Sequence, residues 1–264
     1  MPVHYKDEGS GIPLVLLHGT ASSLHTWQGW TEELKGNFRV IRPDLPAFGL
    51  TGPTPEGVYT IEFYTRFLKQ FLDSLEVKHC YLAGNSLGGG IAWSFVVEYP
   101  EYVNKLILLD ASGYPVESPP FIFTLARVPV VSHLLRHITP KFIVESNVEA
   151  VYFDDDKVTD ALVERYYELT LREGNRQAFI DRARSGGNSY STEDVGKIDV
   201  PTLIMWGRHD EWIPVEDAYR FEEDIPESYL KIYENAGHVP MEEIPEQTAG
   251  DARAFLLNPD LPKQ

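Results

Sequence analysis

The amino-acid sequence predicts an α/β protein whose mostly parallel sheet is covered by helices on both faces. Short runs rich in Val, Ile and Leu alternate with longer amphipathic segments along most of the 264 residues. The runs are almost continuously apolar, as expected of strands buried on both faces of a parallel sheet. This alternation is typical of doubly wound folds, in which ligands bind at the carboxyl ends of the strands.

Six short apolar runs have the residue content of strands. They read IPLVLLH (Ile12–His18), FRVIRP (Phe38–Pro43), CYLAG (Cys80–Gly84), KLILLD (Lys105–Asp110), TLIMWG (Thr202–Gly207) and YLKIYE (Tyr229–Glu234). The amphipathic segments between them are predicted to be helices near Thr31–Leu34, Ile61–Leu75, Gly90–Glu98, Val215–Asp224 and Pro245–Leu257.

One long segment breaks the alternation, because no clear strand is visible from Gly113 to about Gly187. It contains two helix-like stretches, and Thr159 is placed to cap the second. The sequence therefore predicts a core domain formed by residues 1–112 and 188–264, with residues 113–187 inserted as a helical lid over the strand ends. The apolar residues of this segment suit a hydrophobic substrate, and ordinary packing on the sheet explains each of them equally well.

The bulk composition excludes several classes of partner. Asp and Glu number 40 against 23 Lys and Arg, and the net charge of −17 repels the phosphates of nucleic acids. No run of 18 apolar residues is present, so a membrane span is not expected. The N-terminus lacks the pattern of a secretory signal, and Cys80 has no second cysteine with which to form a disulfide. A cytoplasmic location is the resulting expectation, and the oligomeric state stays open.

The strongest motif lies in the turn between the predicted strand Cys80–Gly84 and the next helix. It reads Gly84-Asn85-Ser86-Leu87-Gly88 and matches the pattern G-x-S-x-G. Such a turn holds the serine in a strained backbone conformation and projects its hydroxyl above the sheet, with glycines where side chains would collide. The N–H groups of the following helix point at the place where an oxyanion would form. The strand-turn-helix context favours a nucleophile over an incidental serine in a Gly-rich turn.

A serine hydroxyl needs a base that a carboxylate holds in place. Asp210 follows the strand that ends at Gly207, and His238 follows the strand that ends near Glu234. Both are therefore expected at the same sheet edge as Ser86, and the chain order Ser, Asp, His is the one expected for this turn. No pair of histidines has metal-ligand spacing beside a third candidate, so we predict no metal and no other cofactor.

Several stretches together resemble the α/β-hydrolase superfamily, serine-triad branch, over essentially the whole chain. They are LVLLHGTASSLHTW, RVIRPDLPAFGLTG, LAGNSLGGGIAW, KLILLDASG, PTLIMWGRHDEWIP and NAGHVPMEEIP. The resemblance implies that Thr20 and Leu87 supply the two oxyanion N–H groups. It also implies that His18 holds a loop, and that Asp44 is a turn residue near the pocket. The residues expected to line the substrate pocket are His25, Phe48, Asn85, Phe121, Phe123 and Val239.

The sequence departs from the family pattern at two places. VHYKDEGSG already looks like the second strand of the family, so we expect a sheet that is one strand short at its edge. Ala47 stands in DLPAFG where a glycine is usual, which could reshape the pocket. The triad acid has a competitor, because some relatives carry it after the strand that here ends at Asp110. Asp210 matches the commoner position and is preferred.

The serine at position 86 argues against the dehalogenase and epoxide hydrolase branches, which need an aspartate there. Hydrolysis of small to medium hydrophobic carboxylic esters through an acyl-enzyme is the first expectation. A carbon–carbon bond hydrolase of the meta-cleavage-product type is the second, because those enzymes share Gly-Asn-Ser-x-Gly-Gly. The chain has HGTASS and Val239 where they carry a glycine-rich stretch and an aromatic residue. A ligand receptor on a hydrolase scaffold is the third.

Overall fold

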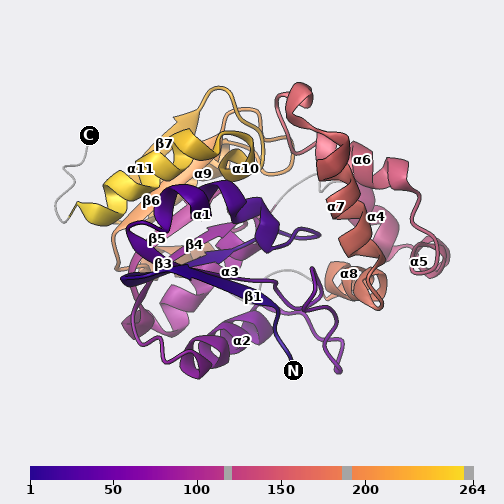
Figure 1. Ribbon diagram of the computed structural model, residues 1–264, viewed down its shortest axis with the longest axis horizontal. Helices are drawn as coiled ribbons and strands as arrows, with labels where there is room; N and C mark the ends of the chain where they lie inside the picture. Colours follow the sequence, from indigo (N-terminus) through magenta and orange to yellow (C-terminus); the bar gives the residue numbers. More distant parts are fainter. Residues whose placement is uncertain (116–120, 186–191, 259–264) are drawn as a thin grey trace.

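A seven-stranded sheet forms the centre of the protein (Figure 1). The computed structural model describes residues 1–115, 121–185 and 192–258. The strands are β1 (Tyr5–Gly9), β2 (Ile12–Leu17), β3 (Phe38–Pro43), β4 (Cys80–Asn85), β5 (Val103–Leu109), β6 (Thr202–Gly207) and β7 (Ser228–Tyr233), in the order β1-β3-β2-β4-β5-β6-β7. Only β1 is antiparallel to its neighbour, and it lies at the edge. The predicted mostly parallel sheet, with the VHYKDEGSG segment as its edge strand, is confirmed.

Helices cover both faces because successive strand residues point to opposite sides of the sheet. Leu14 and Leu16 of β2 pack into one core, and Val15 and Leu17 pack into the other. The first core is shared with α1 (Gln28–Leu34) and α11 (Pro245–Leu257). The second is shared with α2 (Ile61–Ser74), α3 (Leu87–Glu98) and α9 (Glu216–Asp224). The doubly wound arrangement that the sequence predicts is therefore confirmed.

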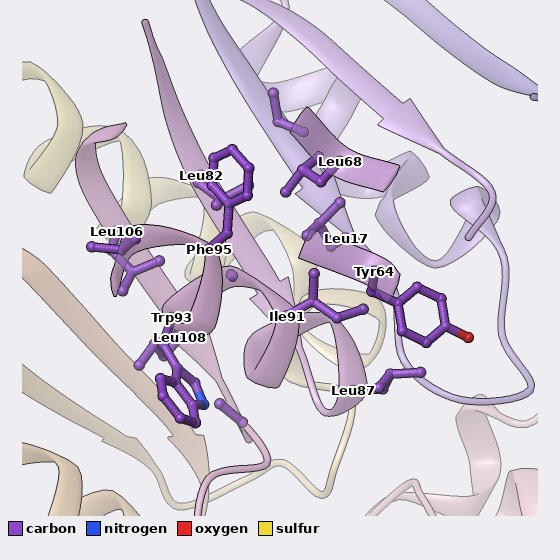
Figure 2. Packing of buried hydrophobic residues seen from close by; sticks show 14 of the residues in the cluster. Leu17, Tyr64, Leu68, Leu82, Leu87, Ile91, Trp93, Phe95, Leu106 and Leu108 are labelled. Atoms are coloured by element: carbon purple, nitrogen blue, oxygen red, sulfur yellow. The ribbon is translucent and has the colours of Figure 1, made fainter. Parts of the chain in front are cut away.

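The packing between β4 and α3 fixes the position of the Gly84–Gly88 turn. Figure 2 shows Leu17, Leu82 and Leu108 from the strands lying against helical side chains that include Ile91 and Phe95. The helix α3 is apolar on all sides, as expected of a helix buried between a sheet and its neighbours. It begins at Leu87, directly after the serine of the motif.

Between β5 and β6 the described residues form helices and no strand. These are α4 (Phe121–Arg127), α5 (Pro129–Leu135), α6 (Lys141–Glu149), α7 (Asp160–Leu171) and α8 (Asn175–Arg184), and Figure 1 shows them gathered on one side of the sheet. The hydroxyl of Thr159 accepts a hydrogen bond from the Leu162 N–H, which confirms the predicted cap of α7. Among the described helices, none has the length and apolar character needed to cross a bilayer.

Two helical glycines provide a matched test of how tightly α3 packs on β2. A methyl group on Gly88 would lie 2.2 Å from the carbonyl oxygen of Leu17, whereas a methyl group on Gly250 in α11 would meet nothing within 4 Å. We expect Gly250→Ala to raise the free energy of unfolding by about 0.5–1 kcal/mol, because alanine favours helix. Gly88→Ala should lower the same quantity by at least about 2 kcal/mol, because the backbone must shift.

Denaturant unfolding of the parent and both variants measures these differences. A Gly88→Ala protein as stable as the parent would contradict the close approach of α3 to β2.

Candidate active site

Ser86 lies between β4 and α3 in a backbone conformation that few non-glycine residues adopt, with φ 54° and ψ −117°. Its N–H donates to the Leu109 carbonyl at 3.1 Å. Its own carbonyl accepts hydrogen bonds from the N–H of Gly90 (3.0 Å), the N–H of Ser112 (3.0 Å) and the hydroxyl of Ser112 (3.1 Å). The backbone of Ser86 is therefore fixed by α3 on one side and by the chain that follows β5 on the other.

The glycines on either side of Ser86 are required by close backbone contact. A Cβ on Gly84 would lie 2.2 Å from the carbonyl oxygen of Gly88. A Cβ on Gly88 would lie 2.2 Å from the carbonyl oxygen of Leu17. Larger residues would push the turn apart. The sharp turn leaves the Ser86 side chain on the wall of a cavity, partly accessible rather than packed in the core.

His238 and Asp210 form a buried pair on the neighbouring strand ends. The Nδ1–H of His238 donates to Oδ2 of Asp210 over 2.7 Å, and the two side chains are 4% and 0% exposed. The other carboxylate oxygen, Oδ1, accepts from the N–H groups of Trp212 at 2.7 Å and Ile213 at 3.0 Å. These donors fix the carboxylate, and the carboxylate in turn fixes the imidazole with its proton on Nδ1. His238 lines the same cavity as Ser86.

Asn85 connects the Ser86 turn to the loop that carries His238. Its amide group donates to the carbonyl of His238 at 2.9 Å and to that of Leu109 at 3.3 Å. The N–H of His238 donates to the carbonyl of Val151 at 2.9 Å, so the backbone of His238 is held at both its polar groups. Asn85 lines the cavity, as expected for a pocket residue, but its amide hydrogens are directed to the main chain.

Thr20 and Leu87 lie on the two segments that meet beside Ser86. A Cβ on Gly19 would lie 3.1 Å from that of Ser86, so the segment that carries Thr20 passes very close to the turn. Leu87 begins α3, where N–H groups have no acceptor within the helix. Among the described residues, neither N–H donates a hydrogen bond to another backbone group. Both groups are therefore candidate donors to a negative oxygen near Ser86.

His18 fixes the segment that carries Thr20. Its Nδ1–H donates to the carbonyl of Gly19 at 2.8 Å, and its Nε2 accepts from the N–H of Leu45 at 2.9 Å. Burial lowers the pKa of His18, so the ring stays neutral and can accept at Nε2. The loop-holding contacts expected from the resemblance are present. Asp44 lies nearby and accepts from the N–H groups of Leu24 and Leu50 at 2.7 and 2.8 Å.

The cavity beside Ser86 and His238 has a volume of about 150 Å³ and is mainly apolar. Of the residues that the sequence places at the site, Thr20, Phe48, Asn85, Ser86, Phe123, His238 and Val239 line it. His25 does not, because its ring turns away to within 3.1 Å of the Ser23 hydroxyl. Phe121 begins α4, but its side chain lies outside the described residues.

Sequence reasoning missed three aromatic residues that line the cavity, Tyr166, Phe179 and Trp212. The Trp212 ring lies 5.4 Å from the His238 ring at 31°, and it contacts Phe123 edge-on at 6.0 Å. Tyr166 of α7 lines the cavity and donates its hydroxyl to Glu242 at 2.8 Å. Burial and the Glu242 charge raise the pKa of Tyr166, which keeps this hydroxyl a donor. The short spacing from Asp210 to Trp212 was a signal in the sequence, whereas nothing local marked Tyr166.

Asp110, the competing acid, lies beside Asp210, and it accepts a hydrogen bond from the end of the neighbouring strand β6. Its Oδ1 accepts from the N–H of Gly207 at 2.9 Å. One oxygen from each carboxyl group and one ring nitrogen of His238 lie within 4.8 Å of one another. The carboxylate that accepts from His238 is the one of Asp210.

Comparison with known proteins gives a consistent family. The family model described as alpha/beta hydrolase fold matches residues 12–245. A 2-hydroxy-6-oxo-6-(2'-aminophenyl)hexa-2,4-dienoic acid hydrolase of Metapseudomonas resinovorans is 30% identical over 96% of this chain and 86% of its own length. A 2-hydroxy-6-oxo-2,4-heptadienoate hydrolase of Pseudomonas putida is also 30% identical, over 88% of this chain and 84% of its own.

Solved structures with a similar fold include hydrolases of two kinds. A thermophilic esterase from Thermogutta terrifontis superposes with a TM-score of 0.83 at 28% identity, over 96% of this chain and 92% of that one. A meta-cleavage product hydrolase from Pseudomonas fluorescens IP01 superposes with a TM-score of 0.85 at 25% identity, over 96% and 93%. The similarity therefore extends to both ester and carbon–carbon hydrolases.

The strain at Ser86 can be measured by comparing glycine and alanine at this position. A non-glycine residue in such a conformation costs about 1–3 kcal/mol, and the extra freedom of glycine in the unfolded chain costs about 0.4–1 kcal/mol. We expect Ser86→Gly to be more stable than Ser86→Ala by about 1 kcal/mol in denaturant unfolding. At Ser94, inside α3, the order should be reversed. A Ser86→Ala protein that is more stable than Ser86→Gly, as expected for the corresponding pair at Ser94, would contradict strain at Ser86.

Proposed function

The chain belongs to the alpha/beta hydrolase fold family, and from this premise we propose that it is a serine hydrolase that cleaves carboxylic esters through an acyl-enzyme. The single observation that carries the proposal is the buried His238–Asp210 hydrogen bond of 2.7 Å, because His238 lines the same cavity as Ser86. Ser86 is the nucleophile, His238 the general base and Asp210 the acid of a catalytic triad.

The reaction proceeds in two halves. The Ser86 hydroxyl attacks the ester carbonyl while His238 takes its proton at Nε2, and Asp210 stabilises the imidazolium. The N–H groups of Thr20 and Leu87 receive the negative oxygen of the tetrahedral intermediate. His238 then gives the proton to the leaving alkoxide, which departs as the alcohol and leaves an ester on Ser86. Water, deprotonated by His238, attacks this ester, and His238 then returns the proton to Ser86 Oγ as the carboxylic acid leaves.

The cavity favours small to medium hydrophobic esters. An apolar cavity of about 150 Å³ holds a group of roughly the size of benzene. Ile122, Phe123 and Leu135 come to its wall from the helices between β5 and β6. These contributions support the proposal that residues 113–187 form a lid that sets specificity and leaves the chemistry to the core formed by residues 1–112 and 188–264.

A carbon–carbon bond hydrolase is the second candidate. Two of the relatives above are named for the hydrolysis of 2-hydroxy-6-oxo-dienoates, which carry a carboxylate. Arg176 of α8 lines the cavity and could bind such a group. Its NH1 donates to the His137 carbonyl at 2.9 Å, and the rest of the cavity wall is mainly apolar. The neutral ester is therefore preferred.

The two reactions can be separated by one pair of substrates. We expect kcat/KM for p-nitrophenyl butyrate to be at least about 100-fold higher than kcat/KM for 2-hydroxy-6-oxo-2,4-heptadienoate, because the transition state of ester hydrolysis should be stabilised more strongly. Initial rates with both substrates at one pH provide the measurement. The reverse order would assign the chain to the second candidate, and turnover of neither would favour a receptor.

Removal of the nucleophile tests the triad itself. Ser86→Ala should lower kcat for p-nitrophenyl butyrate by about 10³-fold or more, since only substrate binding and the oxyanion N–H groups remain. Asp210→Asn should lower kcat by up to about 10⁴-fold while the protein stays folded, because the imidazole loses its correct tautomer. Asp199→Asn, at an exposed position, is the control and should match the parent. A Ser86→Ala protein with parental kcat would place the nucleophile elsewhere.

Phe123 provides a test of the lid. Phe123→Ala enlarges the cavity, so the acyl length with the highest kcat/KM in a p-nitrophenyl ester series should increase, while acetate hydrolysis stays within about 10-fold of the parent. Phe142→Ala is the matched control, because Phe142 is 65% exposed on α6 and does not line the cavity. An unchanged chain-length profile for Phe123→Ala would remove this residue from the pocket.

A further inference from the structure

Three carboxyl groups, one of them that of the proposed triad acid, are buried in the same region, and they differ in the number of hydrogen-bond donors that they receive. Asp110 and Glu243 are 0% and 4% exposed, and the Asp210 side chain is fully buried. Ligand oxygens of Asp110 and Asp210 lie within 4.8 Å of each other, and two buried charges this close repel strongly, so the two groups cannot both ionise easily. The number of N–H donors that each carboxyl group receives indicates which of them keeps a proton.

Two of the groups receive three donors each, which favours their charged form. Asp210 accepts from Trp212 N–H, Ile213 N–H and His238 Nδ1–H. Glu243 accepts from the N–H groups of Phe153 (3.1 Å), Asp154 (2.9 Å) and Gly237 (2.8 Å).

Asp110 receives a single donor. The N–H of Gly207 reaches Oδ1 at 2.9 Å, while Oδ2 is buried without a partner among the residues that the structure describes. The Asp110 backbone cannot move the group away, because its N–H donates to the Met205 carbonyl at 3.1 Å and its φ is fixed at 44°. A charged Oδ2 in this place would lack any compensation, whereas a protonated carboxyl group has an oxygen of Asp210 within 4.8 Å as a candidate acceptor.

We propose that Asp110 carries a proton in the working enzyme and donates its Oδ2–H to the carboxylate of Asp210, as a positioning residue for the acid of the triad. Burial, and then the neighbouring Asp210 charge, raise the pKa of Asp110 well above its ordinary value. The catalytic part of this inference rests on the proposed function. The protonation state does not, and the first experiment below tests it separately.

The neutral acid has two consequences for the site. The protonated Asp110 adds a hydrogen-bond donor to the Asp210 carboxylate, which further restricts the orientation of the group that orients His238. It also adds no negative charge next to the imidazole. The ionisable groups around Asp110 are Asp210, Glu243, His238 and Tyr233, whose hydroxyl donates to Asp251 at 3.0 Å. None of these provides a cation except His238 during turnover.

The pH dependence of stability tests the protonation. An unfolded aspartate loses its proton near pH 4, so above that pH the folded parent keeps a proton on Asp110 that the unfolded chain has lost, and the contribution of this group to stability falls as pH rises. Asp110→Asn removes this proton. Between pH 5 and 8 the Tm of the parent should therefore fall more than the Tm of Asp110→Asn. Asp199→Asn changes an exposed aspartate and should follow the parent. Parallel curves for the parent and Asp110→Asn would overturn the proposal.

Activity tests the hydrogen bond. Asparagine keeps the shape of aspartic acid and can donate a hydrogen bond from Nδ2. Asp110→Asn should therefore retain kcat for p-nitrophenyl butyrate within about 3-fold, because the hydrogen bond to Asp210 is kept. Leucine has a similar shape and cannot donate. Asp110→Leu should lose about 10- to 100-fold in kcat with little change in KM.

Circular dichroism checks that both variants are folded. If Asp110→Leu does not fold, Asp110→Ala with its smaller side chain takes its place. Equal kcat for the donating and the non-donating variant would overturn the positioning role, and loss of activity in Asp110→Asn alone would show that a charged carboxylate is needed. Parental activity of Ser86→Ala would contradict the proposed triad, but it would not affect the stability test of Asp110 protonation.

Discussion

The sharp turn at Ser86 is the constraint on which the rest of the site depends. Gly84 and Gly88 allow β4 and α3 to meet so closely that the serine between them takes a positive φ, and its carbonyl is held by three donors. The apolar helix α3 is pressed against β2, which brings Gly19 beside Ser86. The strain is thus balanced by packing of the core, and the nucleophile and both candidate oxyanion donors are positioned by one set of contacts.

The site also contains a cluster of buried ionisable groups, each of which has different hydrogen-bond partners. The imidazole of His238 has one carboxylate partner, and that carboxylate has two backbone donors of its own. Asp110 is drawn into the same region because β5 and β6 are parallel neighbours. Its single backbone donor makes the neutral form the favourable one. Two acids of the same type thereby differ in charge, because their hydrogen-bond partners differ.

The fold and the centre of the site could be predicted because their signals are local. Apolar runs indicated β2 to β7, and the Gly84–Gly88 motif, with the order of Asp210 and His238, indicated that these side chains lie at the same edge of the sheet. Tyr166 could not be found this way, since it reaches the cavity from α7, far away in the sequence. His25 misled for the opposite reason, because a nearby turn suggested the pocket while Ser23 holds the ring elsewhere. The pairing of Asp110 with Asp210 depends on strand order, which no local pattern reports.

The central claim is that Ser86 carries the acyl group during turnover. Rapid mixing of the protein with excess p-nitrophenyl butyrate, followed by acid quenching and peptide mass spectrometry, tests it most directly. We predict a butyryl group on the peptide that contains Ser86, with a burst of p-nitrophenol when deacylation is slower than acylation. Turnover without an adduct under conditions that give a burst, or an adduct on a different residue, would contradict the account.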